Sequence, residues 1–475
     1  MVVQIAEIIS SRFPLQPTRQ QQEAFIRLAD FLQFTDDHTC FVLKGFAGTG
    51  KTTLISTLVK ALPALYMRSV LLAPTGRAAK VMGNYSGKKA TTIHKKIYRK
   101  KVAISPNMAF GLAENFHTDT LFIVDEASMI SNERFSVNGK SLLEDLVEYA
   151  RNGKNCRLMF VGDVAQLPPV GLLQSPALDP PWLERVFGMR VFVHELTEVV
   201  RQEKHSGILY NATVIRQQIH SASGQEESVP FPHFRIKGFP DIYRMTGERL
   251  IEGLHYAYDK YGMENTLIIC RSNRNANLYN QHIRNRILFR EEELTGGDYI
   301  MVVRNNYYWL SADSNRTGFI ANGDMARVRR VRNMHEQHGF RFADASLEFM
   351  DSDEIEPIDC RIMLDTLQSD SPSLSQSDQQ RLFDAIMIDY ADIPDKKTRL
   401  AALKADPYYN ALQIKFAMAI TCHKAQGGQW QAVFVDQGYL TDEMLDVEFL
   451  RWLYTACTRA TKELFLVNFS DNFFS

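Results

Sequence analysis

Several features that define other protein classes are missing from this 475-residue sequence. It contains no run of about 18 apolar residues, so it predicts no membrane-spanning helix. Its six cysteines are scattered without a C-x-x-C pair, which argues against a zinc site and a disulfide framework and suits a reducing compartment. The N-terminal stretch has no basic lead and no evident cleavage site, so we interpret it as mature protein and expect a cytoplasmic location.

The charge of the whole chain gives no sign of a polyanionic partner, because the net charge is only −1 at pH 7. Locally, however, residues 86–101 (SGKKATTIHKKIYRKK) contain seven lysines and arginines and no acidic residue. Such a run is often only a solvated helix face. Because His94 and Tyr98 lie among the lysines, the segment favours a nucleic-acid surface.

Four apolar runs in the first half of the chain each end in a polar cluster: CFVLKG, SVLLAP, TLFIV and RLMFVG. Their Val, Leu, Ile and Phe residues are continuous rather than alternating, which predicts strands buried on both faces of a parallel sheet. Ligands bind outside the carboxyl ends of such strands. The polar clusters therefore mark a candidate site.

The remaining sequence predicts a second domain, an inserted barrel, a loop and a hairpin. A second α/β domain is expected from residues 196–294 and 416–475, after a first domain at 1–195. Between its two segments, β-rich stretches with Gly, Asn and Asp turns predict a small β-barrel inserted at 295–415. The polar stretch 368–380 is expected to be a mobile loop. A hairpin is expected within 96–117, with its turn at 105–107.

The segment GFAGTGKTT (45–53) is a full match to the glycine-rich phosphate-binding loop. Its glycines let backbone N–H groups approach phosphate, Lys51 reaches the outer phosphates, and Thr52 ligates Mg²⁺ through its hydroxyl. A chance glycine turn is the weaker interpretation, because a predicted strand precedes the loop and a predicted helix follows it. The predicted nucleotide-binding residues of the loop are Gly45, Ala47, Gly48, Thr49, Gly50, Lys51, Thr52 and Thr53.

Two polar clusters downstream supply candidate catalytic groups. Asp125 can complete the Mg²⁺ site, while its neighbour Glu126 can orient and deprotonate the attacking water. Gln166, just past another strand end, can contact both the γ-phosphate and the water. The alternative interpretations are a helix N-cap for the acidic pair and a surface loop for Gln166.

Two arginines in the predicted second domain could reach the same nucleotide. Arg201 and Arg459 would stabilise the charge that spreads over the transferring phosphoryl group. For either arginine alone, a surface salt bridge is the commoner explanation. If both reach the nucleotide, hydrolysis depends on closure of two domains.

Eight segments occur in one order between residues 45 and 461: GFAGTGKTT, APTGRAAK, TTIHKKI, IVDEASM, GDVAQLPPV, LTEVVRQ, ITCHKAQGGQW and LYTACTRAT. This set resembles the superfamily 1 helicases of the RecD-like and Dda-like group, which move 5′ to 3′ on single-stranded DNA. The resemblance covers nearly the whole chain and favours the compact Dda-like form. It implies two RecA-like parallel-sheet domains, a strand-separating β-hairpin pin and an inserted SH3-like barrel.

The resemblance also implies roles for individual residues. It places Lys51, Thr52, Asp125, Glu126, Gln166, Arg201 and Arg459 in ATP hydrolysis with Mg²⁺, and it assigns Gln21 to adenine. The residues that it assigns to the DNA strand are Pro74, Thr75, Thr91, His94, His423 and Lys424. It implies a monomer that acts on single-stranded and tailed duplex DNA, with single-strand-binding, replication or repair proteins as protein partners.

Three other functions remain open at this stage. An RNA-directed motor of the same superfamily is separated from a DNA motor only by the subgroup resemblance. A nucleotide-gated binding protein that does not translocate is disfavoured because Glu126, Gln166 and both arginines are present. A simple phosphate-loop kinase is disfavoured, because that function does not account for the predicted second domain.

Overall fold

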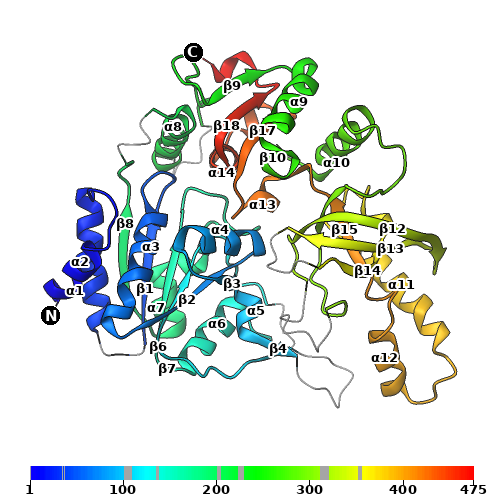
Figure 1. The fold of residues 1–475 in the computed structure, drawn as a ribbon, viewed down its shortest axis with the longest axis horizontal. Coiled ribbons are helices and arrows are strands. Elements are labelled where there is room, and N and C mark those ends of the chain that lie inside the picture. The colour runs from blue at the N-terminus through cyan, green and yellow to red at the C-terminus, as the bar shows by residue number, and fades with distance from the viewer. Residues whose placement is uncertain are drawn as a thin grey trace.

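The computed structural model describes residues 2–34, 36, 38–100, 110–134, 139–200, 205–222, 229–310, 320–350 and 356–474. Two α/β units and a β-barrel make up the chain, with the barrel on the side away from the N-terminus (Figure 1). Among the described residues, every helix is too short or too polar to cross a membrane.

The first α/β unit is built on a six-stranded parallel sheet with strand order β3-β2-β6-β7-β1-β8. Buried apolar residues dominate β1, β6 and β7, which confirms the prediction of a parallel sheet covered on both faces. The strands are β1 (Thr39–Gly45), β2 (Arg68–Ala73), β3 (Ala90–Thr92), β6 (Thr118–Val124), β7 (Lys154–Gly162) and β8 (Arg190–Leu196). The helices are α1 (Val2–Ser10), α2 (Arg19–Gln33), α3 (Lys51–Ala61), α4 (Gly76–Ser86), α5 (Ile93–Ile97), α6 (Leu142–Arg151) and α7 (Pro180–Phe187).

The second α/β unit has a five-stranded parallel sheet with strand order β16-β10-β17-β18-β9. Its strands come from both sides of the barrel in the sequence. They are β9 (Ile242–Met245), β10 (Thr266–Cys270), β16 (Ala419–Thr421), β17 (Trp430–Asp436) and β18 (Ala460–Val467). The helices are α8 (Gly207–Ala222), α9 (Leu250–Tyr261), α10 (Asn273–His282), α13 (Cys422–Ala425) and α14 (Val447–Cys457).

The inserted part is a closed five-stranded barrel. Its strands are β11 (Tyr299–Val302), β12 (Met325–Gln337), β13 (Phe340–Phe349), β14 (Ile358–Met363) and β15 (Leu412–Phe416). Neighbouring strands are antiparallel except β14 and β15, which run parallel. The prediction of an inserted small barrel is therefore confirmed.

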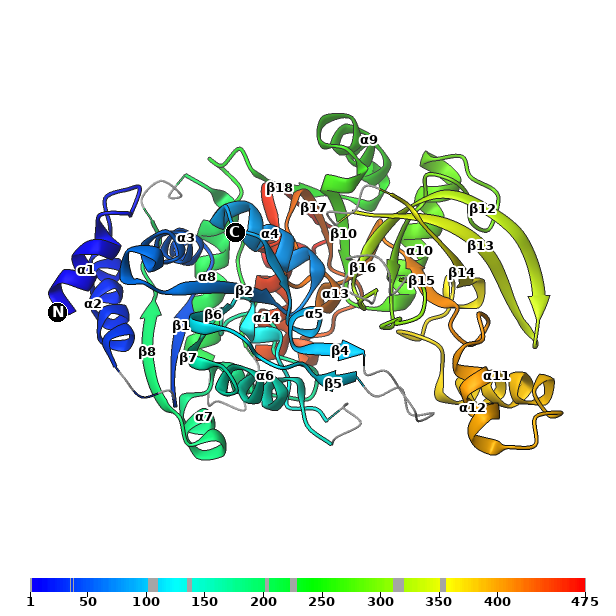
Figure 2. The same ribbon diagram turned by 60° about the horizontal axis from the view of Figure 1, so that its bottom comes forward.

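Two helices between β14 and β15 differ from the sequence-based expectation of a purely β insertion. They are α11 (Gln376–Asp389) and α12 (Lys396–Lys404), and they project beyond the barrel in both views (Figure 2). The predicted mobile loop at 368–380 is thus wrong for its last five residues, which form the first turns of α11. The physical reason is that Ser375 caps the helix through Asp378 N at 3.1 Å, while Leu382 and Ile386 are buried against the barrel.

The predicted hairpin is described only at its base. The strand β4 (Tyr98–Lys100) pairs antiparallel with β5 (Phe110–Leu112). The predicted turn at 105–107 lies outside the described residues. Figure 2 shows β4 and β5 extending from the first α/β unit on the side of the barrel.

Candidate nucleotide and nucleic-acid sites

The glycine loop between β1 and α3 has the backbone of a phosphate cradle. Gly48 and Gly50 have φ angles of +73° and +84°, which favour glycine because a side chain would be strained there. Lys51 Nζ and Thr49 Oγ1 both donate to the Phe46 carbonyl, at 2.9 Å each. The loop is therefore folded over its own lysine, and the positive end of α3 points into it.

Gln21, which the resemblance assigns to adenine, lies beneath the loop and is 2% exposed. Its Nε2 donates to the Thr49 carbonyl at 3.2 Å. Its Oε1 accepts from Thr18 N at 3.0 Å, as part of the capping box of α2. Both polar groups of the amide are engaged, so contact with a base requires one of these partners to be exchanged.

Asp125 and Glu126 follow the carboxyl end of β6. Asp125 Oδ2 accepts from the Tyr85 hydroxyl at 2.6 Å, and Oδ1 accepts from Glu126 N at 2.8 Å. Glu126 has φ +51°, a left-handed conformation that is strained for a residue with a side chain. The strained turn and the fixed aspartate separate the two carboxylates into different positions.

Arg459 approaches Glu126 from the second α/β unit. Its Nη1 lies 4.0 Å from Glu126 Oε1, and the two side chains are 5% and 23% exposed. Arg459 is held by the Thr455 and Gly428 carbonyls, at 3.1 and 3.2 Å. Burial raises the pKa of Glu126, with Arg459 opposing the rise and Asp125 adding to it. A carboxylate with a raised pKa is suited to act as a general base.

Replacing Glu126 by glutamine tests this electrostatic environment. We expect turnover to fall by about 10²–10⁴-fold, the usual contribution of a general base. Because the folded-state pKa is raised, ionised Glu126 destabilises the fold at pH values above its unfolded pKa of about 4.3. Glu126→Gln should therefore raise the melting temperature at pH 8. The gain should shrink as the pH falls through the raised pKa and vanish below pH ~4, which a thermal scan at several pH values measures.

Gln166 lies just past β7 with its side chain buried at 6% exposure. Its Oε1 has no hydrogen-bond partner among the described residues. Buried polar atoms are nearly always paired, so an unpaired acceptor in a cleft indicates a place where a donor such as water would be received. This orphaned atom fits the predicted contact of Gln166 with the attacking water.

The loop 163–167 is hydrogen-bonded to α14 and to Gln426, which follows α13, in the second unit. Arg451 Nη1 donates to the Val164 carbonyl at 2.6 Å. Leu167 N donates to Thr455 Oγ1 at 2.9 Å. Gln426 Nε2 donates to the Leu167 carbonyl at 2.6 Å. Movement of α14 must therefore act directly on the segment that carries Gln166.

A cavity of about 370 Å³ collects the predicted hydrolysis residues from both units. Its lining fits a nucleoside triphosphate, because glycine-loop backbone and cationic side chains face carboxylates and an unpaired amide oxygen. Arg201, predicted to act with Arg459, lies outside the described residues. The predicted residues that line the cavity are Ala47, Gly48, Gly50, Lys51, Thr52, Thr53, Asp125, Glu126, Gln166 and Arg459.

Sequence reasoning missed Asp163 and Tyr85, which line this cavity, and Tyr454, which contacts Asp163. Asp163 directly follows β7, and its two carboxylate oxygens accept from Ala165 N and the Tyr454 hydroxyl, at 2.9 and 2.6 Å. Tyr454 lies within the segment LYTACTRAT, which could have drawn attention to it. Tyr85 has no signal in the sequence, because its contact with Asp125 depends on how α4 packs beside β6.

A larger cavity of about 850 Å³ lies between the first unit and the barrel. Pro74 and His94, both predicted to contact nucleic acid, line it from the first unit, and residues 303–307, 409–411 and 413 line it from the barrel. Burial lowers the pKa of His94 to about 4, so its imidazole is neutral at pH 7. It can therefore contact a strand by hydrogen bonding or stacking rather than as a cation.

The other predicted nucleic-acid residues occupy separate elements. Thr75 caps α4 by accepting from Ala78 N at 3.2 Å, and Thr91 lies on the edge strand β3. His423 and Lys424 lie on α13 of the second unit. Burial and the neighbouring Lys415 lower the pKa of Lys424 to about 8, so a phosphate beside it would favour its charged form. The set thus spans both α/β units.

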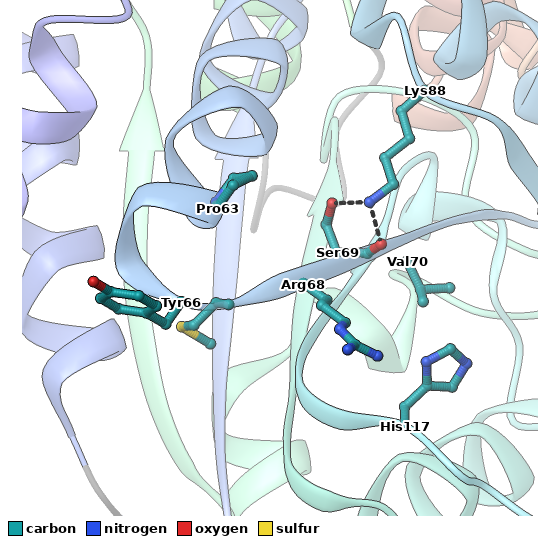
Figure 3. Close-up of a pocket in the computed structure, with 8 residues that line it drawn as sticks. Pro63, Tyr66, Arg68, Ser69, Val70, Lys88 and His117 are labelled. Atoms are coloured by element: carbon teal, nitrogen blue, oxygen red, sulfur yellow. Dashed lines mark hydrogen bonds between the residues drawn. The ribbon is translucent and has the colours of Figure 1, made fainter.

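A third cavity, of about 500 Å³, opens at the amino end of β2 (Figure 3). Lys88 Nζ donates there to the Ser69 carbonyl and hydroxyl, at 2.7 and 2.8 Å. Arg68 and His117 lie below this pair in the view. This cavity is separate from the two described above, because it shares no lining residue with either of them.

Comparison with known proteins gives matches along the whole chain. Residues 17–225 match the family described as AAA domain, and residues 416–467 match the UvrD-like helicase C-terminal domain. The ATP-dependent DNA helicase dda of Enterobacteria phage T4 is 23% identical over 95% of this chain and 99% of the relative. The ATP-dependent RecD2 DNA helicase of Deinococcus radiodurans is 34% identical over 28% of this chain and 16% of the relative. A solved structure of two coordinating Pif1 helicases at forked DNA covers 97% of this chain and 94% of its own, with 15% identity and a TM-score of 0.48.

An AAA domain, a UvrD-like C-terminal domain and a nucleotide cavity lined by both parallel-sheet units together define a superfamily 1 helicase. Within that superfamily, the chain is similar to the Dda and RecD2 helicases. The family resemblance inferred from the ordered segments of the sequence is thereby confirmed.

Proposed function

We propose that this chain is an ATP-dependent 5′-to-3′ translocase on single-stranded DNA and a DNA helicase. The observation that carries the proposal is the position of Arg459 from the second unit beside Glu126 of the first, at 4.0 Å. A hydrolysis site completed by both units couples each nucleotide cycle to their relative movement. The direction of movement rests on the resemblance to the RecD-like and Dda-like group.

In this mechanism, the residues of the first unit bind ATP and prepare its hydrolysis. The loop N–H groups and Lys51 would hold the phosphates, while Thr52 and Asp125 would hold Mg²⁺. Bound Mg²⁺ would neutralise phosphate charge as the terminal bond breaks. Glu126 deprotonates the attacking water, and Gln166 positions it. Arg459, with Arg201 as a second proposed arginine, stabilises the charge of the transition state.

The single strand is proposed to run over residues of both units, in backbone-directed contacts that carry little sequence information. Pro74, Thr75, Thr91 and His94 would hold it on the first unit, and His423 and Lys424 on the second. Closure and opening of the nucleotide cavity would then make the two units bind the DNA strand tightly in alternation.

We further propose that the working domains are 1–195, 196–294 with 416–475, and 295–415. A strand-separating pin is proposed within 96–117.

The proposed cellular setting follows from the same assignment. We propose a monomer in the cytoplasm, with single-strand-binding, replication or repair proteins as its partners. Binding to DNA should weaken steeply with salt, because phosphate contacts release counterions.

Strand separation on tailed duplexes tests direction and activity together. With ATP and Mg²⁺, the chain should unwind a duplex with a 5′ single-stranded tail and leave a 3′-tailed duplex of the same sequence intact. A non-hydrolysable ATP analogue is the control and should support no unwinding. Unwinding from the 3′ tail alone would contradict the proposed direction, and unwinding without hydrolysis would contradict the motor.

An RNA-directed motor remains the second candidate, because the proposed contacts are made to backbone groups that RNA shares. The same duplexes with an RNA tail distinguish the two. Preference for the RNA tail would replace the DNA assignment while leaving the hydrolysis site unchanged.

A further inference from the structure

We propose that Tyr454 is a positioning residue whose hydroxyl couples the glycine loop to the catalytic arginine of the opposite unit. The inference rests on the proposed hydrolysis function and adds a residue that neither the ordered segments nor the family matches assign. Tyr454 touches no predicted phosphate or water position itself, so its effect is exerted through Ala47, Asp163 and Arg459.

The hydroxyl of Tyr454 makes two hydrogen bonds across the boundary between the units. It donates to Asp163 Oδ2 at 2.6 Å and accepts from Ala47 N, in the glycine loop, at 2.9 Å. Tyr454 is 1% exposed and belongs to α14 of the second unit, whereas both partners belong to the first. One buried oxygen atom therefore joins the nucleotide loop, the end of β7 and α14.

The same atom is connected to the segment that carries Gln166. Asp163 Oδ1 accepts from Ala165 N at 2.9 Å, and the Asp163 carbonyl accepts from Gln166 N at 3.3 Å. Loss of the Tyr454 hydroxyl would leave Asp163 Oδ2 without its hydrogen-bond donor among the described residues. A buried acceptor without a donor is unfavourable, so this turn would shift or admit water.

Within the second unit, Tyr454 is hydrogen-bonded to the residues at the C-terminal end of α14, just beyond which Arg459 lies. The Tyr454 carbonyl accepts from Thr458 N and Oγ1, at 3.1 and 2.9 Å. Thr458 Oγ1 in turn accepts from Arg459 Nη2 at 3.3 Å, and Thr455 O accepts from Arg459 Nε at 3.1 Å. The position of Tyr454 against the first unit thus fixes the distance between Arg459 and Glu126.

Burial raises the pKa of Tyr454 well above its usual range, with the charge of Asp163 adding to the rise. The phenol therefore remains protonated and donates to Asp163 throughout the working pH range. The coupling is a fixed hydrogen bond between neutral phenol and carboxylate, and it responds to movement of the two units rather than to pH.

The variant Tyr454→Phe removes the hydroxyl and keeps the buried ring. The matched control is Tyr279→Phe, because the Tyr279 hydroxyl also donates to a partly buried aspartate, Asp436 Oδ1 at 2.9 Å, with both residues inside the second unit. ATP turnover is measured for both variants and the unchanged protein, with and without single-stranded DNA. Melting temperature and binding of a fluorescent ADP analogue are measured in parallel.

We expect Tyr454→Phe to lower the DNA-stimulated kcat about tenfold or more while the KM for ATP changes less than threefold, the loss being in the transition state. Tyr279→Phe should keep both the kcat and the ratio of turnover with and without DNA. An unchanged kcat and ratio in Tyr454→Phe would overturn the inference, as would a loss equal to that of Tyr279→Phe. If the unchanged protein itself shows no DNA stimulation, the proposed function fails first, so the two failures are distinguishable.

Discussion

Replacing Arg459 by alanine is expected to reduce kcat for ATP hydrolysis by about 10³–10⁵-fold, the range associated with an arginine finger. The Arg459 side chain is 5% exposed and its Nη1 lies 4.0 Å from Glu126 Oε1, so it acts in a site from which water is largely excluded. Its removal leaves the charge of the transferring phosphoryl group without one of the two arginines proposed to stabilise it. Steady-state turnover at saturating ATP and DNA measures the loss.

The control for this prediction is Arg459→Lys. Lysine keeps the positive charge but lacks the planar fork that binds the Thr455 and Gly428 carbonyls at once, so it should restore only a minor part of the rate. Binding of the ADP analogue should persist in both variants and shows that the protein is folded. Full activity in Arg459→Ala would show that this arginine takes no part in catalysis. Hydrolysis would then not depend on closure of the two domains.

Replacing Lys51 by alanine is expected to abolish ATP hydrolysis, because no other described cation occupies the glycine loop. Lys51 lines the nucleotide cavity, and its ammonium group is held inside the loop by the Phe46 carbonyl at 2.9 Å. Single-stranded DNA binding should stay within severalfold of the original value, since the proposed strand contacts lie on other elements. Turnover and fluorescence-anisotropy binding measure the two effects separately.

The matched control is Lys60→Ala, because Lys60 lies in the last turn of the same helix, α3. That variant should retain turnover and binding alike. Retained turnover in Lys51→Ala would contradict the assignment of the phosphate loop, whereas lost DNA binding would show that the two sites cannot be separated.

The parts of the site that the sequence predicted are those formed by local segments. The glycine loop, the Asp125–Glu126 pair and Gln166 each follow a strand whose continuous apolar residues indicate a parallel sheet, so their meeting at one edge follows from the fold class. The barrel was predictable for a similar reason, since its strands alternate with Gly, Asn and Asp turns.

The parts that the sequence did not predict depend on contacts between distant segments. The Tyr454 hydroxyl is hydrogen-bonded to Ala47 and Asp163, which are 407 and 291 residues away in the sequence. These two hydrogen bonds exist only once the two domains are packed together. Helices α11 and α12 were missed because their few apolar residues are buried against the barrel rather than within a helical core of their own. The engaged amide of Gln21 likewise reflects the packing of α2 under the glycine loop.

Mg²⁺-dependent ATP turnover by the unchanged protein, without nucleic acid and with single-stranded DNA or RNA of equal length, tests the DNA motor most directly. A DNA motor should hydrolyse ATP slowly alone and be stimulated at least about tenfold by DNA, because its strand contacts lie on both units that form the hydrolysis site. RNA of the same length should stimulate it much less. Turnover that is equal with and without either polymer would contradict coupling between the nucleotide cavity and a bound strand.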